Sequence, residues 1–168
     1  PPDVNASRAQ FSADGEELSL DLSLRNAGGA PRTVEAALHT YLAVGDVTAV
    51  SITGLEGARY SDRLTDEERV QDGPIRFSGR VDRIYRARGP VAVTDPAGRR
   101  RIVVTGVRAP NAVVWNPWNR VAATMADLGE EWPSMVCVES AAVRDQAVRL
   151  EPGESMSLGA RIGVEPLS

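Results

Sequence analysis

The sequence predicts an all-β protein, an antiparallel β-sandwich that forms one domain over residues 1–168. Three observations lead to this prediction. Short stretches of β-branched and apolar residues recur along the chain, and turn-forming segments such as residues 26–31 and 95–98 separate them. Only one stretch has a convincing helical pattern. No internal repeat and no low-complexity linker divides the chain, and its 168 residues suffice for one hydrophobic core.

The first half of the chain predicts three strands. Residues 18–25 alternate leucine with polar or charged residues without a break, which is typical of a half-buried strand. We expect the next strand over residues 33–43 and a short β-branched strand over residues 47–53. Residues 61–73 carry many charges and little periodicity, so they predict a long exposed connection. Residues 1–14 have only a weak pattern, which predicts no element there.

The second half predicts more strands and one short helix. The strands are expected over residues 75–81, 90–94, 101–106, 111–115, 135–142, 146–150 and 155–164. Asn119 is expected to cap a helix over residues 120–128, with Val121, Met125 and Leu128 on one side. Many short strands with almost no helix favour a β-sandwich.

The composition excludes several classes of function. The net charge is −4, which argues against a nucleic-acid partner, and the basic cluster at residues 99–101 is more simply a solvated shoulder of the hairpin beside it. No apolar run approaches the roughly 18 residues of a membrane span, and no signal-peptide pattern opens the chain. The single cysteine, Cys137, cannot form an internal disulfide, so we expect a cytoplasmic protein in which Cys137 is a small buried hydrophobe.

Two chemically reactive side chains stand at the ends of apolar segments. If residues 135–140 form a strand, Met135, Cys137 and Glu139 share one face, and a glutamate is rarely buried without a partner. His39, the only histidine, follows a similar apolar segment with Tyr41 on the same side. One carboxylate and one imidazole can form a general acid–base pair. Taken alone, each residue also has a structural interpretation: a hydrogen-bonded histidine in a strand, and a glutamate exposed at a strand end.

Five segments occur in an order that resembles a known family. They are Leu-His-Thr-Tyr at 38–41, Gly-Leu-Glu-Gly-x-x-Tyr-x-Asp at 54–62, Val-Asp-Arg-Ile-Tyr at 81–85, Val-Val-Trp-Asn-Pro-Trp at 113–118 and Met-Val-Cys-Val-Glu at 135–139. Any one of them alone is a weak signal, whereas the ordered set is specific. From about residue 18 to the C-terminus, the chain resembles the hexose-6-phosphate mutarotase (glucose-6-phosphate 1-epimerase) branch of the aldose 1-epimerase superfamily.

This resemblance implies a galactose mutarotase-like supersandwich that interconverts the α and β anomers of a hexose 6-phosphate, such as glucose 6-phosphate. It implies that His39 is the catalytic acid, Glu139 the catalytic base and Asp82 a substrate-binding residue. Tyr41 or Trp115 is expected to pack on the C–H face of the sugar ring. The resemblance implies no metal and no organic cofactor, and we expect a monomer whose partner is a small hexose phosphate.

The substrate-binding residues have structural alternatives as well. Asp82 lies between Arg80 and Arg83 in the sequence, so a plain surface salt bridge is an alternative role for it. Trp115 and Trp118 flank a proline and serve equally well as core or loop anchors. If His39 and Glu139 act on one sugar, we expect them to converge on a common pocket, about a sugar's width apart, and neither needs to touch the other.

The chain departs from the family pattern at its N-terminal end. Family members are longer, and their additional part carries a second histidine in a His-Gly-x-x-Arg pattern together with phosphate-binding arginines. We therefore expect this chain to be the C-terminal part of a longer epimerase domain, without the N-terminal strands. A non-catalytic carbohydrate-binding or regulatory module is the alternative function, and a purely structural sandwich domain is a third. The retained Glu139 favours the enzyme, because a binding module has no need of a base.

Overall fold

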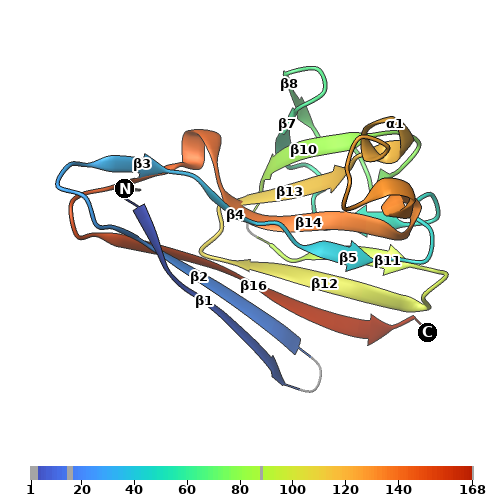
Figure 1. Cartoon of the computed structure of the whole chain (residues 1–168). Coiled ribbons are helices and arrows are strands. Elements are labelled where there is room, and N and C mark those ends of the chain that lie inside the picture. The colour runs from blue at the N-terminus through green and yellow to red at the C-terminus, as the bar shows by residue number, and fades with distance from the viewer. Residues whose placement is uncertain (1–3, 15–16, 88, 168) are drawn as a thin grey trace.

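The computed structural model describes residues 4–14, 17–87 and 89–167, and within them two antiparallel sheets form two layers (Figure 1). The first sheet contains, in spatial order, β1 (Val4–Asp14), β2 (Glu17–Asn26), β16 (Ser155–Pro166), β12 (Arg100–Val107), β11 (Val91–Asp95), β6 (Ser51–Thr53) and β9 (Ile75–Arg76). The second contains β4 (Ala36–Leu38), β14 (Met135–Ala142), β13 (Asn111–Asn116), β10 (Val81–Arg86), β7 (Arg59–Asp62) and β8 (Glu67–Val70), and β5 (Tyr41–Ala43) also pairs with β14. A small separate ladder joins β3 (Arg32–Val34) to β15 (Val148–Leu150).

The core lies between the two layers. Inward-facing residues of the central strands form it, so that Val93 and Ile102 of the first sheet belong to the same buried cluster as Val114, Val136 and Val138 of the second. The predicted antiparallel β-sandwich is therefore confirmed. The strands predicted over residues 18–25, 101–106, 135–142 and 155–164 are present as β2, β12, β14 and β16.

The N-terminal segment differs from the sequence prediction. Residues 4–14 form β1, an eleven-residue strand that pairs with β2 along its length. Its side chains from Ala9 to Ala13 are exposed, and Phe11 is 72% exposed. Because this part of the strand buries no face, its sequence carries no alternation, and pairing with β2 defines it instead.

The strand predicted over residues 33–43 is broken into three. β3 leaves the second sheet to pair with β15, while β4 and β5 both pair with β14 and are separated by His39 and Thr40. His39 therefore lies in a short connection and not inside a strand. The strand predicted over residues 47–53 is shorter than expected, because only β6 is formed.

Two further segments were predicted wrongly. Residues 61–73 are not one long exposed connection: β7 and β8 form a hairpin in them, and the exposed charged strand β8 is an edge of the second sheet. Charges on an edge strand oppose pairing with other chains, which explains why this strand lacks a hydrophobic pattern. The strand predicted over residues 75–81 is divided between β9 of the first sheet and β10 of the second.

The predicted helix is much shorter than expected. The helix α1 covers only Trp118–Ala122, its N-cap is Pro117 without a side-chain cap, and Asn119 lies inside the helix. After it the chain continues through turns to the 3₁₀-helix η1 (Gly129–Ser134), and a second 3₁₀-helix, η2, covers Arg144–Gln146. In the described residues, no helix has the length and apolar character needed to cross a membrane.

Candidate active site

Strand register brings His39 to Glu139. β4 pairs Leu38 with Ser140, and β5 pairs Tyr41 with Cys137. Both strands keep the same register along β14, so the connection between them places His39 directly opposite Glu139. Directly opposite residues of an antiparallel pair point to the same face of the sheet. The two residues that the sequence predicts as acid and base therefore meet on the outer face of the second sheet, away from the core.

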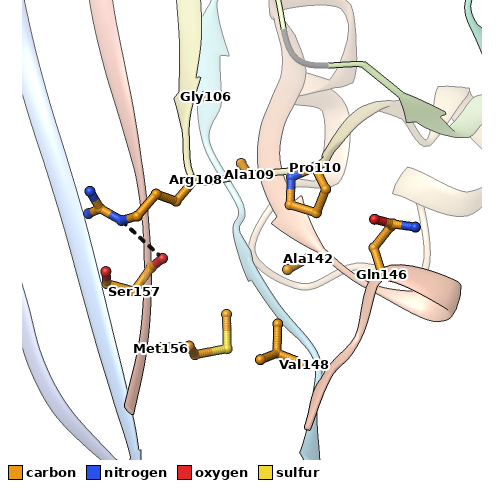
Figure 2. A pocket seen from close by; sticks show the side chains of 9 residues that line it. All are labelled: Gly106, Arg108, Ala109, Pro110, Ala142, Gln146, Val148, Met156 and Ser157. Atoms are coloured by element: carbon orange, nitrogen blue, oxygen red, sulfur yellow. Dashed lines mark hydrogen bonds between the residues drawn. The ribbon is translucent and has the colours of Figure 1, made fainter. Parts of the chain in front are cut away.

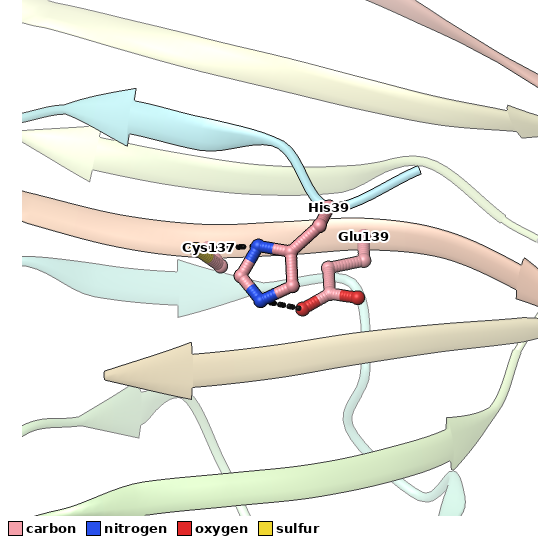
Figure 3. A group of neighbouring side chains, drawn as sticks. All are labelled: His39, Cys137 and Glu139. Atoms are coloured by element: carbon pink, nitrogen blue, oxygen red, sulfur yellow. Dashed lines mark hydrogen bonds and ion pairs between the residues drawn. The ribbon is translucent and has the colours of Figure 1, made fainter. Parts of the chain in front are cut away.

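The imidazole ring of His39 lies between two side chains of β14 (Figure 3). Its Nε2 is 3.2 Å from Oε1 of Glu139, and its Nδ1 is 3.5 Å from Sγ of Cys137. The side chain of His39 is 47% exposed, whereas that of Glu139 is 7% exposed. The two side chains meet on one face as predicted, but they touch instead of standing a sugar's width apart, and neither of them lines the cavity beside Tyr41.

Two aromatic side chains hold the plane of the imidazole ring. The ring of Tyr41 stacks on it with centroids 4.8 Å apart, and the indole of Trp115 meets it edge-on at 5.5 Å. Tyr41 is 48% exposed, and Trp115 is half-buried. These two residues, predicted to pack against a sugar, lie beside the acid–base pair and expose apolar surface there.

Asp82 belongs to the same face of the sheet. Register pairs Asp82 with Trp115, Trp115 with Cys137 and Cys137 with Tyr41, so these four residues form one row across β10, β13, β14 and β5. The Asp82 side chain is 24% exposed, and its Oδ2 is 3.3 Å from Nη2 of Arg80. The alternative salt bridge with Arg80 is thus present. The other arginine that the sequence offered, Arg83, lies by Asp62, at 3.5 Å from Nε to Oδ2.

Burial favours the uncharged form of both Glu139 and His39. Removal from water raises the pKa of Glu139 from 4.5 to about 7, and the negative charge of Asp82 adds to this rise. Partial burial lowers the pKa of His39 from 6.5, against the opposing effects of its own backbone carbonyl and of Asp82. A carboxyl group whose pKa lies near neutral pH can exchange a proton with an imidazole in contact with it.

The site is closed on one side by the segment between β13 and β14. Asn116 is fully buried, and its side-chain amide donates hydrogen bonds to the carbonyl oxygens of Trp132 and Met135, at 2.9 and 2.8 Å. Its Oδ1 accepts a hydrogen bond from the backbone N–H of Trp118. These bonds hold α1 and η1 against β14, where Leu128 packs with Cys137 in a small apolar cluster.

His39, Cys137 and Glu139 also form a group of donor atoms within 4.8 Å of one another. The sulfur and the carboxylate oxygen face opposite nitrogens of the same ring, however. A metal ion binds a histidine through one nitrogen, so it could not take both other donors without a turn of the ring. Burial also raises the pKa of the Cys137 thiol, which opposes the thiolate form that binds metals. This arrangement fits an acid–base pair better than a metal centre.

The contact between Cys137 and His39 is the part of the site that sequence reasoning missed. Cys137 was interpreted as a small buried hydrophobe, and it is indeed fully buried. Its place on the same strand face as Glu139 was visible in the alternation of residues 135–140. From this shared face one could have predicted that a side chain that reaches Glu139 from a neighbouring strand also lies near the Cys137 thiol.

One cavity lies beside the site, and another lies away from it. A cavity of about 400 Å³, lined by Tyr41, Leu128 and Met135 among others, adjoins the aromatic side of the site. Another cavity, of about 520 Å³, lies by the turn between β12 and β13 and is lined by Arg108, Pro110, Val148 and Met156 among others (Figure 2). None of the five predicted site residues lines the second cavity.

The fold and the site can now be compared with known proteins. The family model for aldose 1-epimerase matches residues 7–163 of the chain. The chain belongs to the aldose 1-epimerase family. This family assignment agrees with the resemblance that the five sequence segments indicated.

Curated relatives within this family carry a more specific name. A protein from Cenchrus ciliaris named "Putative glucose-6-phosphate 1-epimerase" is 40% identical over 144 residues, which are 82% of this chain and 44% of the relative. A protein of the same name from Escherichia coli is 36% identical over 110 residues, which are 63% of this chain and 37% of the relative. The chain thus spans less than half of the length of these two relatives.

Solved structures in the family share the fold. The crystal structure described as a putative mutarotase, YeaD, from Salmonella typhimurium superposes with a TM-score of 0.82 at 27% identity, over 94% of this chain and 52% of that one. A galactose mutarotase-like protein from Clostridium acetobutylicum has a TM-score of 0.69 at 12% identity, over 95% of this chain and 55% of that one. The β-sandwich of this aldose 1-epimerase family member is therefore of the galactose mutarotase-like type.

Proposed function

We propose that this protein is an aldose 1-epimerase that interconverts the α and β anomers of a hexose 6-phosphate, with Glu139 as base and His39 as acid. The observation that carries the proposal is the 3.2 Å contact between Nε2 of His39 and Oε1 of Glu139, on a sheet face where burial raises the pKa of Glu139 to about 7. Family membership supports the reaction class. The names of the curated relatives support glucose 6-phosphate as the substrate.

The reaction needs one proton acceptor and one proton donor. Glu139 removes the proton of the C1 hydroxyl while His39 donates a proton to the ring oxygen, and the bond between C1 and that oxygen breaks. The product is the open-chain aldehyde, which rotates about its C1–C2 bond. Reclosure on the other face returns both protons, so the enzyme ends in its starting state. Because the two oxygens are bonded to one carbon, adjacent acid and base atoms can reach both of them.

The remaining site residues have binding roles in this proposal. Asp82, on the same row of the sheet as Trp115 and Cys137, accepts a hydrogen bond from a sugar hydroxyl. Tyr41 and Trp115 pack against the C–H surface of the ring, while their contacts with His39 keep the imidazole in place.

The proposal is tested by anomer exchange. Magnetisation-transfer NMR measures the exchange between α- and β-glucose 6-phosphate at equilibrium, with unphosphorylated glucose as the comparison substrate. We expect the protein to accelerate exchange of the phosphorylated sugar more strongly. Binding of the sugar without any acceleration would establish the carbohydrate-binding module instead, and equal acceleration of both sugars would remove the phosphate from the proposal.

The pH dependence of the rate should be bell-shaped. The reactive form of the pair holds one proton, with Glu139 ionised as base and His39 protonated as acid, in exchange with the form that carries this proton on Glu139. The rate therefore rises as pH increases through the lowered pKa of His39, where the doubly protonated pair loses its first proton. It falls again as pH increases through about 7, where the pair loses the second proton. A pH series of exchange rates with glucose 6-phosphate checks this prediction. A rate that keeps rising through pH 8 would contradict it.

Replacement of Asp82 by Asn should affect both substrate and pH profile. We expect a weaker hydrogen bond to the sugar, seen as a KM raised by roughly tenfold, with little change in melting temperature because the Arg80 pair is partly exposed. Loss of the Asp82 charge also removes one cause of the raised pKa of Glu139, so the falling limb of the profile should move to lower pH.

The matched control is Asp145→Asn. It breaks an exposed pair, Arg86 with Asp145, whose side-chain atoms are 2.7 Å apart. This variant should leave KM and the pH profile unchanged. If Asp82→Asn behaves like Asp145→Asn, Asp82 is only a salt-bridge partner of Arg80.

A further inference from the structure

The two nitrogens of the His39 ring contact chemically different partners. Nδ1 faces the Cys137 sulfur at 3.5 Å, and Nε2 faces the Glu139 carboxylate at 3.2 Å (Figure 3). The contacts with Tyr41 and Trp115 fix the plane of the ring, but aromatic packing does not distinguish one ring nitrogen from the other. What Cys137 and Glu139 donate or accept therefore decides which nitrogen carries the proton.

We propose that Cys137 is a positioning residue for His39: its thiol donates a hydrogen bond to Nδ1 and so keeps the proton of the neutral ring on Nε2, beside Glu139. The catalytic meaning of this hydrogen bond rests on the proposed function. The hydrogen bond itself does not, and it can be measured without substrate.

The burial of Cys137 supports its role as a donor. The side chain is fully buried in an apolar cluster with Ala122, Leu128 and Met135. These surroundings, together with the nearby Glu139 charge, raise the pKa of the thiol, so the sulfur keeps its proton wherever the acid–base pair titrates. A protonated thiol is a weak donor, and the unprotonated nitrogen of a neutral imidazole is a good acceptor.

The ionised carboxylate of Glu139 completes the argument, because it can only accept hydrogen bonds. With the proton on Nε2, the ring donates to Glu139 and accepts from Cys137, and both contacts join a donor to an acceptor. With the proton on Nδ1, the lone pair of Nε2 faces a carboxylate oxygen at 3.2 Å, and two acceptors are opposed. The first arrangement gives both ring nitrogens a suitable partner, and the second leaves Oε1 of a mostly buried carboxylate without its donor.

Two influences compete with this arrangement. A hydrogen bond to the backbone of His39 competes for the ring proton and raises the pKa of the ring, although burial has the larger and opposite effect on that pKa. Below a pH of about 7, a protonated Glu139 can itself donate to Nε2. The decisive condition is therefore a pH above 7, where Glu139 is ionised and only Cys137 donates to the ring.

The experiment uses the fact that His39 is the only histidine of the chain. Protein labelled with ¹⁵N-histidine gives one pair of ring nitrogen signals, and the protonated and unprotonated nitrogens have well-separated chemical shifts. At about pH 8.5, above the pKa of Glu139, we expect the proton on Nε2 in the wild-type protein. Cys137→Ser retains an O–H donor and should keep this tautomer, whereas Cys137→Ala should shift the signals toward a mixture of tautomers.

A cavity control separates the lost donor from the lost volume. Val136→Ala truncates the preceding residue, which is fully buried on the opposite face of β14, and leaves the thiol in place. This variant should be destabilised but should keep the wild-type ring signals. A proton on Nδ1 in the wild-type protein, or unchanged signals in Cys137→Ala, would overturn the proposal. The wild-type measurement decides even if Cys137→Ala does not fold.

Activity adds a second measurement. Cys137→Ala should lower kcat for anomer exchange by roughly tenfold with little change in KM, because the ring loses the contact at Nδ1 that orients it. In the reactive pair His39 is protonated, and Nδ1 then donates to the sulfur across the same contact. Cys137→Ser, whose hydroxyl can donate or accept, should restore most of the rate. If the wild-type protein has the expected tautomer but accelerates no exchange, the proposed function fails while the positioning hydrogen bond stands. If exchange is fast and the ring proton lies on Nδ1, the positioning role fails alone.

Discussion

Replacing Glu139 by Gln should lower the rate of anomer exchange by roughly two to four orders of magnitude, the usual range for loss of a general base. Gln has the size and shape of Glu, and its side-chain oxygen can still accept a hydrogen bond from Nε2 of His39. It cannot accept a proton from the C1 hydroxyl, however. Magnetisation-transfer NMR with glucose 6-phosphate measures the effect, and a loss of less than about tenfold would remove Glu139 from the role of base.

The same substitution should not destabilise the protein at pH 8. The pKa of Glu139 is raised from 4.5 to about 7, so the folded protein binds this proton more tightly than the unfolded chain. The stability that the protonated Glu139 side chain contributes to the folded state is therefore lost as pH rises from 4.5 through about 7. A neutral Gln avoids the burial of a charge above that pH. Thermal melts at pH 8 should show Glu139→Gln at least as stable as the wild type.

Glu165→Gln is a suitable control for this pair of measurements. Glu165 is exposed on β16 of the other sheet, where its Oε2 is 3.3 Å from Nη1 of Arg101. Its replacement should change neither the exchange rate nor the pH at which the rate declines. A drop in rate for this variant would mean that carboxylates remote from the site affect the measurement.

The second large effect is expected for His39→Asn. Asn keeps a polar side chain but cannot donate a proton to the ring oxygen, so exchange should fall by roughly two to four orders of magnitude. Because the His39 side chain is 47% exposed and contributes little to the core, the melting temperature should stay close to that of the wild type. The falling limb of the pH profile should also disappear, because the remaining base, Glu139, becomes active as it ionises and no acid is left to lose its proton.

Thr40→Ala tests whether the connection between β4 and β5 matters by itself. Thr40 follows His39, and its hydroxyl donates a hydrogen bond to the carbonyl oxygen of Leu38 at 3.2 Å. This variant should retain activity within a fewfold of the wild type. If it lost as much activity as His39→Asn, the shape of the connection and not the imidazole would explain both results.

Parts of the fold could be predicted from sequence because burial imposes a period of two on a strand. Residues 18–25 show that period, and β2 is found there. Residues 135–142 form a largely apolar run, and β14 is found there. The period is absent where a strand buries no side chains, as in residues 9–13 of β1 and in β8, and both strands were missed. Local pattern also overestimated the helix, because α1 ends after five residues and its segment instead packs on β14.

The sequence by itself determined the candidate residues of the site and the face of β14 that carries Cys137 and Glu139, since alternation along one strand is a local property. Only the tertiary structure decided that His39 lies opposite Glu139 and that Cys137 contacts its other nitrogen, because the register between β14 and the β4–β5 segment joins residues that are 92 or more positions apart. The raised pKa of Glu139 has the same origin. It follows from neighbours contributed by distant strands, and no local pattern contains them.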